Sequence, residues 1–234
     1  MSLDLITPQW PAPAHVHAAT TTRSGGVSPV PFDSLNMAGH VGDEAVLVAT
    51  NRQRLAEALL LPEKPHWLSQ VHGTGVVTLD EGSIGLPEAD ASMTRESGCV
   101  CAVLTADCLP VLFCDRAGTR VAAAHAGWRG LAAGVLESVV EVMDVPGDEI
   151  LAWLGPAIGP RSFEVGEEVY QAFIGTGVEQ NPEASSAFVP SIRSAGVDKK
   201  GRWLADLYQL ARLRLKNVGV TSIYGGGFCT YEDQ

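Results

Sequence analysis

Two residues whose side chains could do chemistry, Cys108 and His125, flank the most informative segment of the chain. Apolar runs lie on both sides of Cys108, and residues 121–124 lead directly into His125. Gly118 supplies a turn between these runs, so the segment is predicted to be a β-hairpin with the thiol and the imidazole at its open end. A thiol and an imidazole at one end of a sheet form either a catalytic dyad or part of a metal site.

Three of the six histidines, His40, His72 and His125, lie in glycine-flanked segments at predicted strand ends or turns. Glycine lets the backbone turn sharply and lets a ligand approach closely. His72, Cys108 and His125 together would provide three protein ligands and leave one position open, which is how catalytic zinc sites are built. Such a metal would also hold Cys108 as the thiolate.

Other chemistries fit the same residues. In a cysteine hydrolase, Cys108 would be the nucleophile, His125 the base and Asp107 the group that orients the base. Two histidines and one cysteine also describe a blue-copper site, although a multicopper oxidase needs more histidines than the six present. The simplest alternative is a small buried thiol beside two hydrogen-bonded histidines. Spacing alone leaves these alternatives open.

Two arginines are candidate anion ligands. Arg23 lies in a glycine-rich turn and Arg129 at the start of a predicted helix, and either guanidinium could bind an anion through two hydrogen bonds. The alternative for each is a solvated surface arginine. Residues 155–160 form a Gly/Pro-rich loop directly after a predicted strand, and loops in that position often form the wall of a binding site.

Composition narrows the class of protein. The 234 residues are 46% hydrophobic, enough for one large core. The net charge of −11 and the lack of a Lys/Arg cluster argue against nucleic-acid binding. No apolar run approaches the roughly 20 residues of a membrane span, and no signal peptide is recognisable. Five cysteines, with Cys99 and Cys101 interpreted as core thiols on one face of a strand, suit a reducing cytoplasm.

Apolar periodicity predicts helices and strands in irregular alternation. Strands are expected at residues 15–22, 67–71, 76–79, 99–104, 111–114, 120–124 and 150–154. Helices are expected at residues 43–60, 130–143, 167–173 and 203–217. This order favours a mixed α/β (α+β) fold with antiparallel hairpins over a doubly wound sheet.

Several short motifs lie between residues 20 and 230. They are residues 22–28, 36–43, 70–74, 106–110, 125–130, 155–159, 163–166 and 226–230. Together they resemble the YfiH family, whose members have been labelled polyphenol oxidase, purine nucleoside phosphorylase and peptidoglycan editing factor. The resemblance implies one YfiH-like domain over residues 1–234 with layered α-β-β-α packing of mixed sheets. The family pattern continues past residue 230 with a final strand, which this sequence is expected to lack.

The resemblance also implies a function. A zinc ion, with copper as the alternative metal, would be held by His72, Cys108 and His125. The enzyme would be a purine nucleoside phosphorylase that cleaves adenosine, inosine, guanosine and methylthioadenosine with phosphate, with adenosine deamination as a second activity. The deaminase signature of His-x-Glu and Cys-x-x-Cys is absent, so deamination would need another arrangement.

Within that function, Arg23, Asn36 and Arg129 are expected to bind substrate or phosphate, and Asp107 to act in catalysis with Cys108 and His125. The expected partners are purine nucleosides and phosphate, with no nucleic acid and no membrane, and the chain is expected to be a monomer or weak homodimer in the cytoplasm. Three alternatives remain. They are a cysteine hydrolase or amidase acting on peptidoglycan precursors, a copper-dependent polyphenol oxidase, and a non-enzymatic protein whose metal braces a binding surface.

Overall fold

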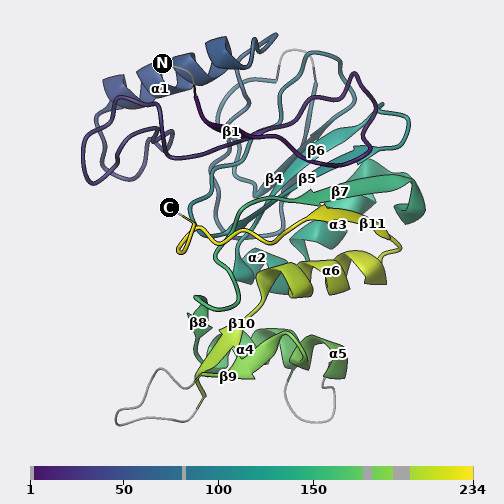
Figure 1. Ribbon diagram of the computed structural model, residues 1–234. Helices are drawn as coiled ribbons and strands as arrows, with labels where there is room; N and C mark the ends of the chain where they lie inside the picture. Colours follow the sequence, from purple (N-terminus) through teal and green to yellow (C-terminus); the bar gives the residue numbers. More distant parts are fainter. Residues whose placement is uncertain (1–2, 81–82, 176–180, 192–200, 234) are drawn as a thin grey trace.

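A six-stranded mixed sheet forms the centre of the computed structural model, which describes residues 3–80, 83–175, 181–191 and 201–233 (Figure 1). The strand order is β11-β7-β5-β6-β4-β3, parallel at the two edge pairs and antiparallel between them. The strands are β3 (Val76–Leu79), β4 (Ala91–Thr94), β5 (Leu109–Asp115), β6 (Val121–Ala126), β7 (Ile150–Leu154) and β11 (Ser222–Gly225).

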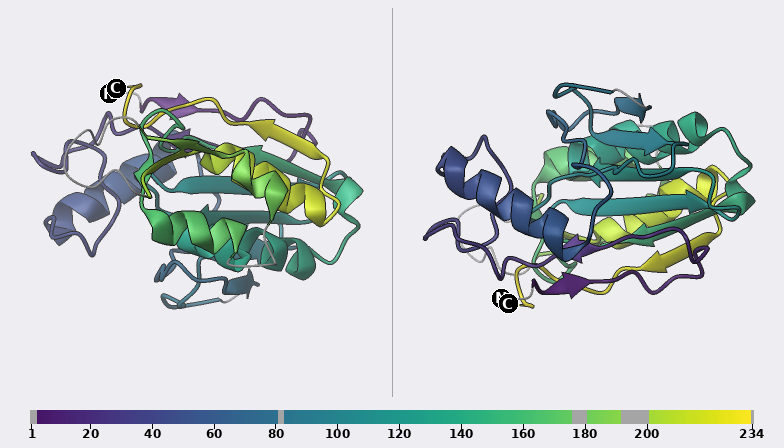
Figure 2. Two further views of the ribbon diagram at one scale, coloured as in Figure 1. Left: turned by 90° about the horizontal axis from the view of Figure 1, so that it is seen from below. Right: turned by 90° about the horizontal axis from the view of Figure 1, so that it is seen from above.

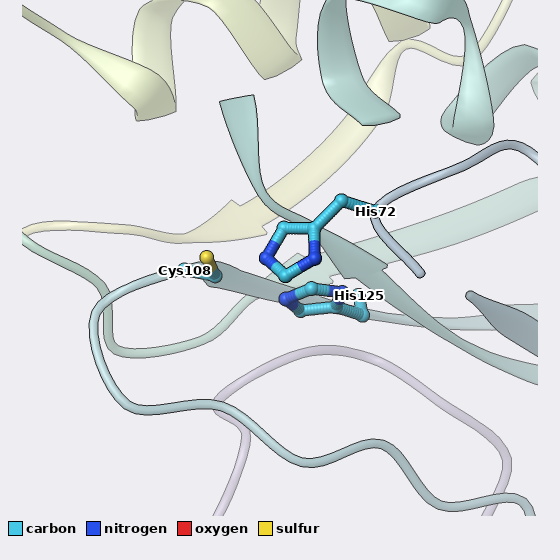
Figure 3. A group of neighbouring side chains, drawn as sticks. All are labelled: His72, Cys108 and His125. Carbon is cyan, nitrogen blue, oxygen red and sulfur yellow. The ribbon is translucent and has the colours of Figure 1, made fainter. Parts of the chain in front are cut away.

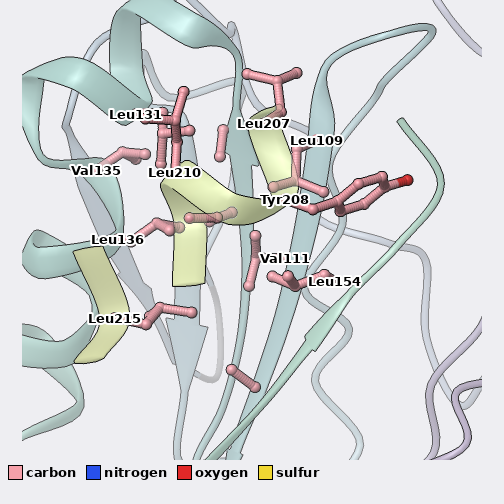
Figure 4. Packing of buried hydrophobic residues seen from close by; sticks show 14 of the residues in the cluster. Leu109, Val111, Leu131, Val135, Leu136, Leu154, Leu207, Tyr208, Leu210 and Leu215 are labelled. Atoms are coloured by element: carbon pink, nitrogen blue, oxygen red, sulfur yellow. The ribbon is translucent and has the colours of Figure 1, made fainter. Parts of the chain in front are cut away.

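Three helices cover one face of this sheet: α2 (Trp128–Ala133), α3 (Val135–Met143) and α6 (Leu207–Asn217). Their apolar faces bury leucine and valine side chains against those of the central strands (Figure 4). Gly134 separates α2 from α3 with φ of 107°, a conformation that glycine adopts without steric cost.

The opposite face is covered by the N-terminal part of the chain. Helix α1 (Ala45–Ala58) lies outermost in Figure 1, and the short pair β1 (Leu5–Ile6) and β2 (Thr20–Thr21) lies between it and the central sheet. Figure 2 shows these segments toward the viewer in its right panel and the helices of the other face in its left panel. This arrangement confirms the mixed α/β single domain with mixed sheets.

A small third sheet lies beyond α6 (Figure 1). Its strand order is β8-β10-β9, all antiparallel. The elements of this part are β8 (Glu164–Val165), α4 (Glu167–Ile174), α5 (Pro182–Ser185), β9 (Phe188–Pro190) and β10 (Trp203–Ala205). The 3-10 turn η1 (Gly147–Glu149) directly precedes β7 of the central sheet. In the described part of the chain, no helix combines the length and apolar character needed to cross a membrane.

The predicted hairpin, the strands at 76–79 and 150–154 and the helices at 43–60 and 167–173 are confirmed within a few residues at each end. The strands predicted at 67–71 and 99–104 are wrong, because those segments form only isolated bridges. Of the strand predicted at 15–22, only β2 forms.

Two predicted helices have different bounds. The helix expected at 130–143 begins at Trp128 and is interrupted at Gly134. The helix expected at 203–217 begins four residues later, because Trp203 to Ala205 pair with β8 and β9 as β10. Asp206 then caps α6 by accepting a hydrogen bond from the backbone N–H of Gln209.

Candidate metal centre

The open end of the β5–β6 hairpin brings Cys108 and His125 together, as predicted. Cys108 directly precedes β5, and His125 in β6 lies opposite Pro110 in β5. His72 approaches from the loop before β3 (Figure 3). One ligand atom from each of the three side chains lies within 4.8 Å of the other two. The imidazole rings of His72 and His125 meet edge to face, with centroids 4.7 Å apart.

A buried carboxylate that no sequence motif indicated, Asp90, organises two of these three residues. Its oxygens accept hydrogen bonds from the backbone N–H groups of Val71 (3.1 Å), His72 (2.9 Å) and Gly73 (2.7 Å). Oδ1 also lies 2.8 Å from Nδ1 of His125. Asp90 therefore holds the loop that carries His72 and orients the ring of His125.

The pairing with Asp90 determines which nitrogen of His125 can bind a ligand. Burial opposes ionisation of Asp90, but the hydrogen bonds from His125 and the three backbone N–H groups outweigh it and hold the pKa of Asp90 below its ordinary value. An ionised carboxylate only accepts, so Nδ1 of His125 carries the proton and Nε2 keeps a free lone pair. Burial lowers the pKa of His125 despite this hydrogen bond, which favours the neutral ring. A neutral histidine held by a carboxylate is the usual arrangement around zinc.

The surroundings of Cys108 favour a metal ligand over a free nucleophile. Burial raises the pKa of its thiol, and the carboxylates of Asp107 and Asp90 raise it further. Nucleophilic cysteines instead lie in electropositive surroundings that lower the thiol pKa. A bound cation would supply the positive charge that the thiolate of Cys108 needs.

Gly127, between β6 and α2, leaves the space in which the three side chains meet. A Cβ atom at this position would lie 3.0 Å from Sγ of Cys108 and 3.0 Å from Cδ2 of His72. The backbone φ of −60° is open to any residue, so only the crowding restricts this position. The three donor atoms, the carboxylate of Asp90 that supports the histidines and the free space beside Gly127 all fit a metal ion with three protein ligands.

Asp107 lies beside the triad formed by His72, Cys108 and His125, and it contacts the last part of the chain. Its Oδ1 accepts a hydrogen bond of 2.6 Å from the hydroxyl of Thr230, and its carbonyl oxygen accepts one of 2.9 Å from the N–H of Ile158. The loop at residues 155–160 therefore lies next to Cys108, where a binding-site wall was expected.

Two of the predicted ligand-binding residues are engaged within the N-terminal segment. The guanidinium of Arg23 donates to the carbonyl oxygen of Asp33 and pairs with its carboxylate at 3.1 Å, on the protein surface. The amide of Asn36 donates to Ala38 and to the carboxylate of Asp43. These contacts stabilise the loop between β2 and α1, and substrate binding by Arg23 and Asn36 stays a prediction.

Arg129 comes soon after His125 in the chain, in the first turn of α2. Its guanidinium lies 4.3 Å from the centroid of the Trp128 ring and is exposed. Within the described residues it forms no ion pair, which leaves its hydrogen-bond donors available to an anion. His40 is exposed in the N-terminal segment and does not join the triad.

The fold and the triad define a family. The family described as multi-copper polyphenol oxidoreductase laccase matches residues 17–234, and the chain belongs to it. A Neisseria meningitidis protein of the DUF152 family superimposes with a TM-score of 0.88 at 50% identity, covering 98% of this chain and 89% of that one. A Bacillus licheniformis protein titled YfiH superimposes with a TM-score of 0.81 at 28% identity, over 92% and 82% of the two chains.

Relatives with curated names extend this comparison. A Pseudomonas aeruginosa protein named purine nucleoside phosphorylase is 58% identical over 228 residues, 97% of this chain and 88% of the relative. An Escherichia coli protein named purine nucleoside phosphorylase YfiH is 55% identical over 98% of this chain and 89% of its own. The resemblance to the YfiH family is confirmed.

Proposed function

We propose that this protein is a zinc-dependent purine nucleoside phosphorylase. The observation that carries the proposal is the meeting of His72, Cys108 and His125 at the open end of the β5–β6 hairpin, with Asp90 holding the two histidine segments. Two relatives named purine nucleoside phosphorylase, 58% and 55% identical to this chain, support the reaction class. The proposed substrates are adenosine, inosine, guanosine and methylthioadenosine together with phosphate, in the cytoplasm.

The proposed zinc ligands are Nε2 of His125, Sγ of Cys108 and an imidazole nitrogen of His72. When bound, zinc supplies a Lewis acid at its open position. The protein must supply the remaining chemistry: phosphorolysis breaks the bond between ribose and base, forms a new bond from the same ribose carbon to phosphate oxygen, and returns a proton to the base. Phosphate needs a cation, and the unpaired guanidinium of Arg129 supports a role for this residue.

We assign proton transfer at the purine to Asp107. Its carboxylate neighbours Cys108 in the chain, and the hydroxyl of Thr230 orients it. The same group would move protons in adenosine deamination, which we propose as a second activity. Arg23 would contribute to phosphate binding only after releasing Asp33. Asn36 would donate its side-chain N–H to the substrate only after releasing Ala38 or Asp43.

Two other functions use the same residues. Oxidation of phenols with copper in the triad is favoured by the description of the family. A cysteine hydrolase acting on peptidoglycan precursors would need Cys108 as a free thiolate, and the raised pKa of this thiol argues against it.

The test combines metal analysis with phosphate-dependent release of the base. We expect chelation to abolish base release from the four nucleosides and zinc to restore it. Cys108→Ser should lose one equivalent of zinc relative to the wild type together with turnover. Ammonia release from adenosine tests the second activity. Full phosphorolysis by metal-depleted Cys108→Ser would refute the proposal.

A paired glycine substitution tests the triad without removing a ligand. Gly127→Ala places a methyl group 3.0 Å from Cys108 and His72, so we expect it to lose zinc and activity. Gly39→Ala is the matched control, since a Cβ atom there meets nothing within 4 Å. If both variants keep full activity and zinc, the metal does not lie between these three side chains.

A further inference from the structure

A second group of metal-ligating side chains lies outside the triad. Ligand atoms of Glu63, His66 and Cys99 all lie within 4.8 Å of one another. The first two come from the loop after α1, and Cys99 comes from the loop after β4. These residues belong to none of the motifs that carry the proposed phosphorolysis.

Two hydrogen bonds from backbone N–H groups hold the two loops together at this point. The N–H of His66 donates to the carbonyl oxygen of Val100 at 3.0 Å, and the N–H of Val100 donates to Oε1 of Glu63 at 3.3 Å. His66 and Cys101 form an isolated β-bridge in the same place. The ligand atoms are therefore brought together by the fold and not by chance contacts of long side chains.

The spacing of the donors fits a tetrahedral ion. Nε2 of His66 lies 3.0 Å from Oε1 of Glu63. Two ligands bound about 2.0–2.2 Å from one zinc ion at tetrahedral angles lie about 3.4 Å apart. The third ligand atom, at up to 4.8 Å, would reach the ion by a side-chain rotation. The His66 side chain is 18% exposed and that of Glu63 is 44% exposed, so ions and water can reach the group.

Charge favours a cation here. Burial opposes ionisation of Glu63, but hydrogen bonds from His66 and Cys99 hold its pKa below the ordinary value. Burial raises the pKa of Cys99, and the charge of Glu63 raises it further. A carboxylate beside a thiol repels the thiolate, and a divalent cation between them would relieve that repulsion.

We propose that Glu63, His66 and Cys99 form a second binding site for a zinc-class divalent cation, separate from the triad of His72, Cys108 and His125. One sulfur, one nitrogen and one oxygen donor match the ligand preferences of zinc, and solvent completes the coordination. As the sulfur–metal bond forms, the S–H bond of Cys99 breaks and its proton passes to solvent. The bound ion would join the loop after α1 to the loop after β4.

The experiment titrates metal-free, full-length protein with Zn²⁺ against a chromophoric chelator. We expect two equivalents in the wild type, one in Cys99→Ser, one in Cys108→Ser and none in the double variant. Cys99→Ser should keep its phosphorolysis rate within about twofold of the wild type, because no proposed catalytic group is changed. A wild type and a Cys99→Ser variant that bind the same number of equivalents, one or two, would overturn the second site.

Cys101→Ser is the matched control, since it removes a thiol two residues away and should keep both equivalents. Loss of an equivalent in Cys101→Ser but not in Cys99→Ser would reject the assigned ligand. Glu63→Gln and His66→Gln test the site if Cys99→Ser does not fold, and each should weaken the second equivalent alone. Cobalt added to Cys108→Ser should give a near-ultraviolet thiolate-to-metal band that disappears in the double variant, and its absence from Cys108→Ser would contradict the proposal.

Discussion

At the scale of single residues, Asp90 shows how one carboxylate can organise a site. It is fully buried and has hydrogen bonds to three consecutive backbone N–H groups and to His125. His72 adopts φ of 61°, which is unusual for a residue with a side chain, and the hydrogen bonds to Asp90 stabilise that turn. The position of two of the proposed metal ligands therefore depends on a residue that would not touch the metal.

Replacing Asp90 with asparagine tests this dependence. The amide of Asp90→Asn cannot accept all four hydrogen bonds, so His125 loses its orientation and the His72 loop is no longer held. We expect the zinc affinity of the triad to fall about 10–100-fold, as is typical when the partner of a metal-bound histidine is removed. Competition with a chelator of known affinity measures this fall.

Asp107→Asn is the natural comparison for that variant. It also removes a carboxylate near Cys108, but one whose hydrogen bond is to Thr230, and it should keep zinc while slowing turnover. Unchanged zinc affinity in Asp90→Asn would show that the ligands are positioned by the backbone alone.

The meeting of His72, Cys108 and His125 was predictable from the sequence, and the role of Asp90 beside them was not. Apolar strands around Cys108 and His125 indicated a hairpin, and the glycine after His72 indicated a turn near a ligand. The partners of Asp90 are backbone N–H groups of residues 71–73, which have no side-chain signature in the sequence. Only the pairing of β4 with β3 and β6 brings them together.

At the scale of elements, the β5–β6 hairpin is closed by Asp115. Its carboxylate accepts hydrogen bonds from the N–H of Thr119 (2.7 Å), the hydroxyl of Thr119 (2.6 Å) and the N–H of Arg120 (2.9 Å). Burial opposes its ionisation, yet these hydrogen bonds hold the pKa of Asp115 below its ordinary value. The turn at one end of the hairpin thereby fixes the register that places Cys108 beside His125 at the other.

The low pKa of Asp115 predicts a dependence of stability on pH. A carboxylate with a lower pKa in the folded state stabilises that state above its unfolded pKa, and the contribution is lost as the pH falls through the folded pKa. We expect Asp115→Asn to lower the free energy of unfolding by about 1–3 kcal/mol at pH 7. The difference from the wild type should shrink below about pH 4.

Urea unfolding of both proteins across this pH range measures the effect. Asp148→Asn, which changes an exposed carboxylate close to the same end of the sheet, should stay within about 0.5 kcal/mol of the wild type at every pH. A difference between wild type and Asp115→Asn that does not change with pH would contradict the assignment to the ionised carboxylate.

Elements with a clear apolar period were predictable, whereas short strands were not. Helix α1 and strand β7 follow their sequence patterns closely. Strand β4 has the sequence Ala-Ser-Met-Thr, and all four residues are buried. Its alternation of apolar and polar residues covers only four positions, three of them small, which is a weak signal for a strand. Strand β10 merges in sequence with the apolar face of α6, and only its pairing with β8 and β9 separates the two.

At the scale of the whole molecule, the triad connects segments that are distant in the chain. His72 precedes β3 at one edge of the sheet, whereas Cys108 directly precedes the central strand β5 and His125 lies in the central strand β6. A metal bound to all three would stabilise the folded state, because the unfolded chain cannot bring these ligands together at comparable cost. The effect should therefore appear in the thermal stability of the entire domain.

We expect zinc to raise the melting temperature. A ligand at 100 times its dissociation constant stabilises by about 2.7 kcal/mol, which for a domain of this size corresponds to about 5–11 °C. Thermal unfolding should be recorded across a series of free zinc concentrations set by a chelator, because mass action requires the shift to grow with zinc. Cys108→Ser should show a smaller rise, retaining only what the Glu63–His66–Cys99 site contributes. The same melting temperature with zinc and with chelator would mean that neither group binds the ion in the folded protein, because a metal that binds only the folded state must stabilise it.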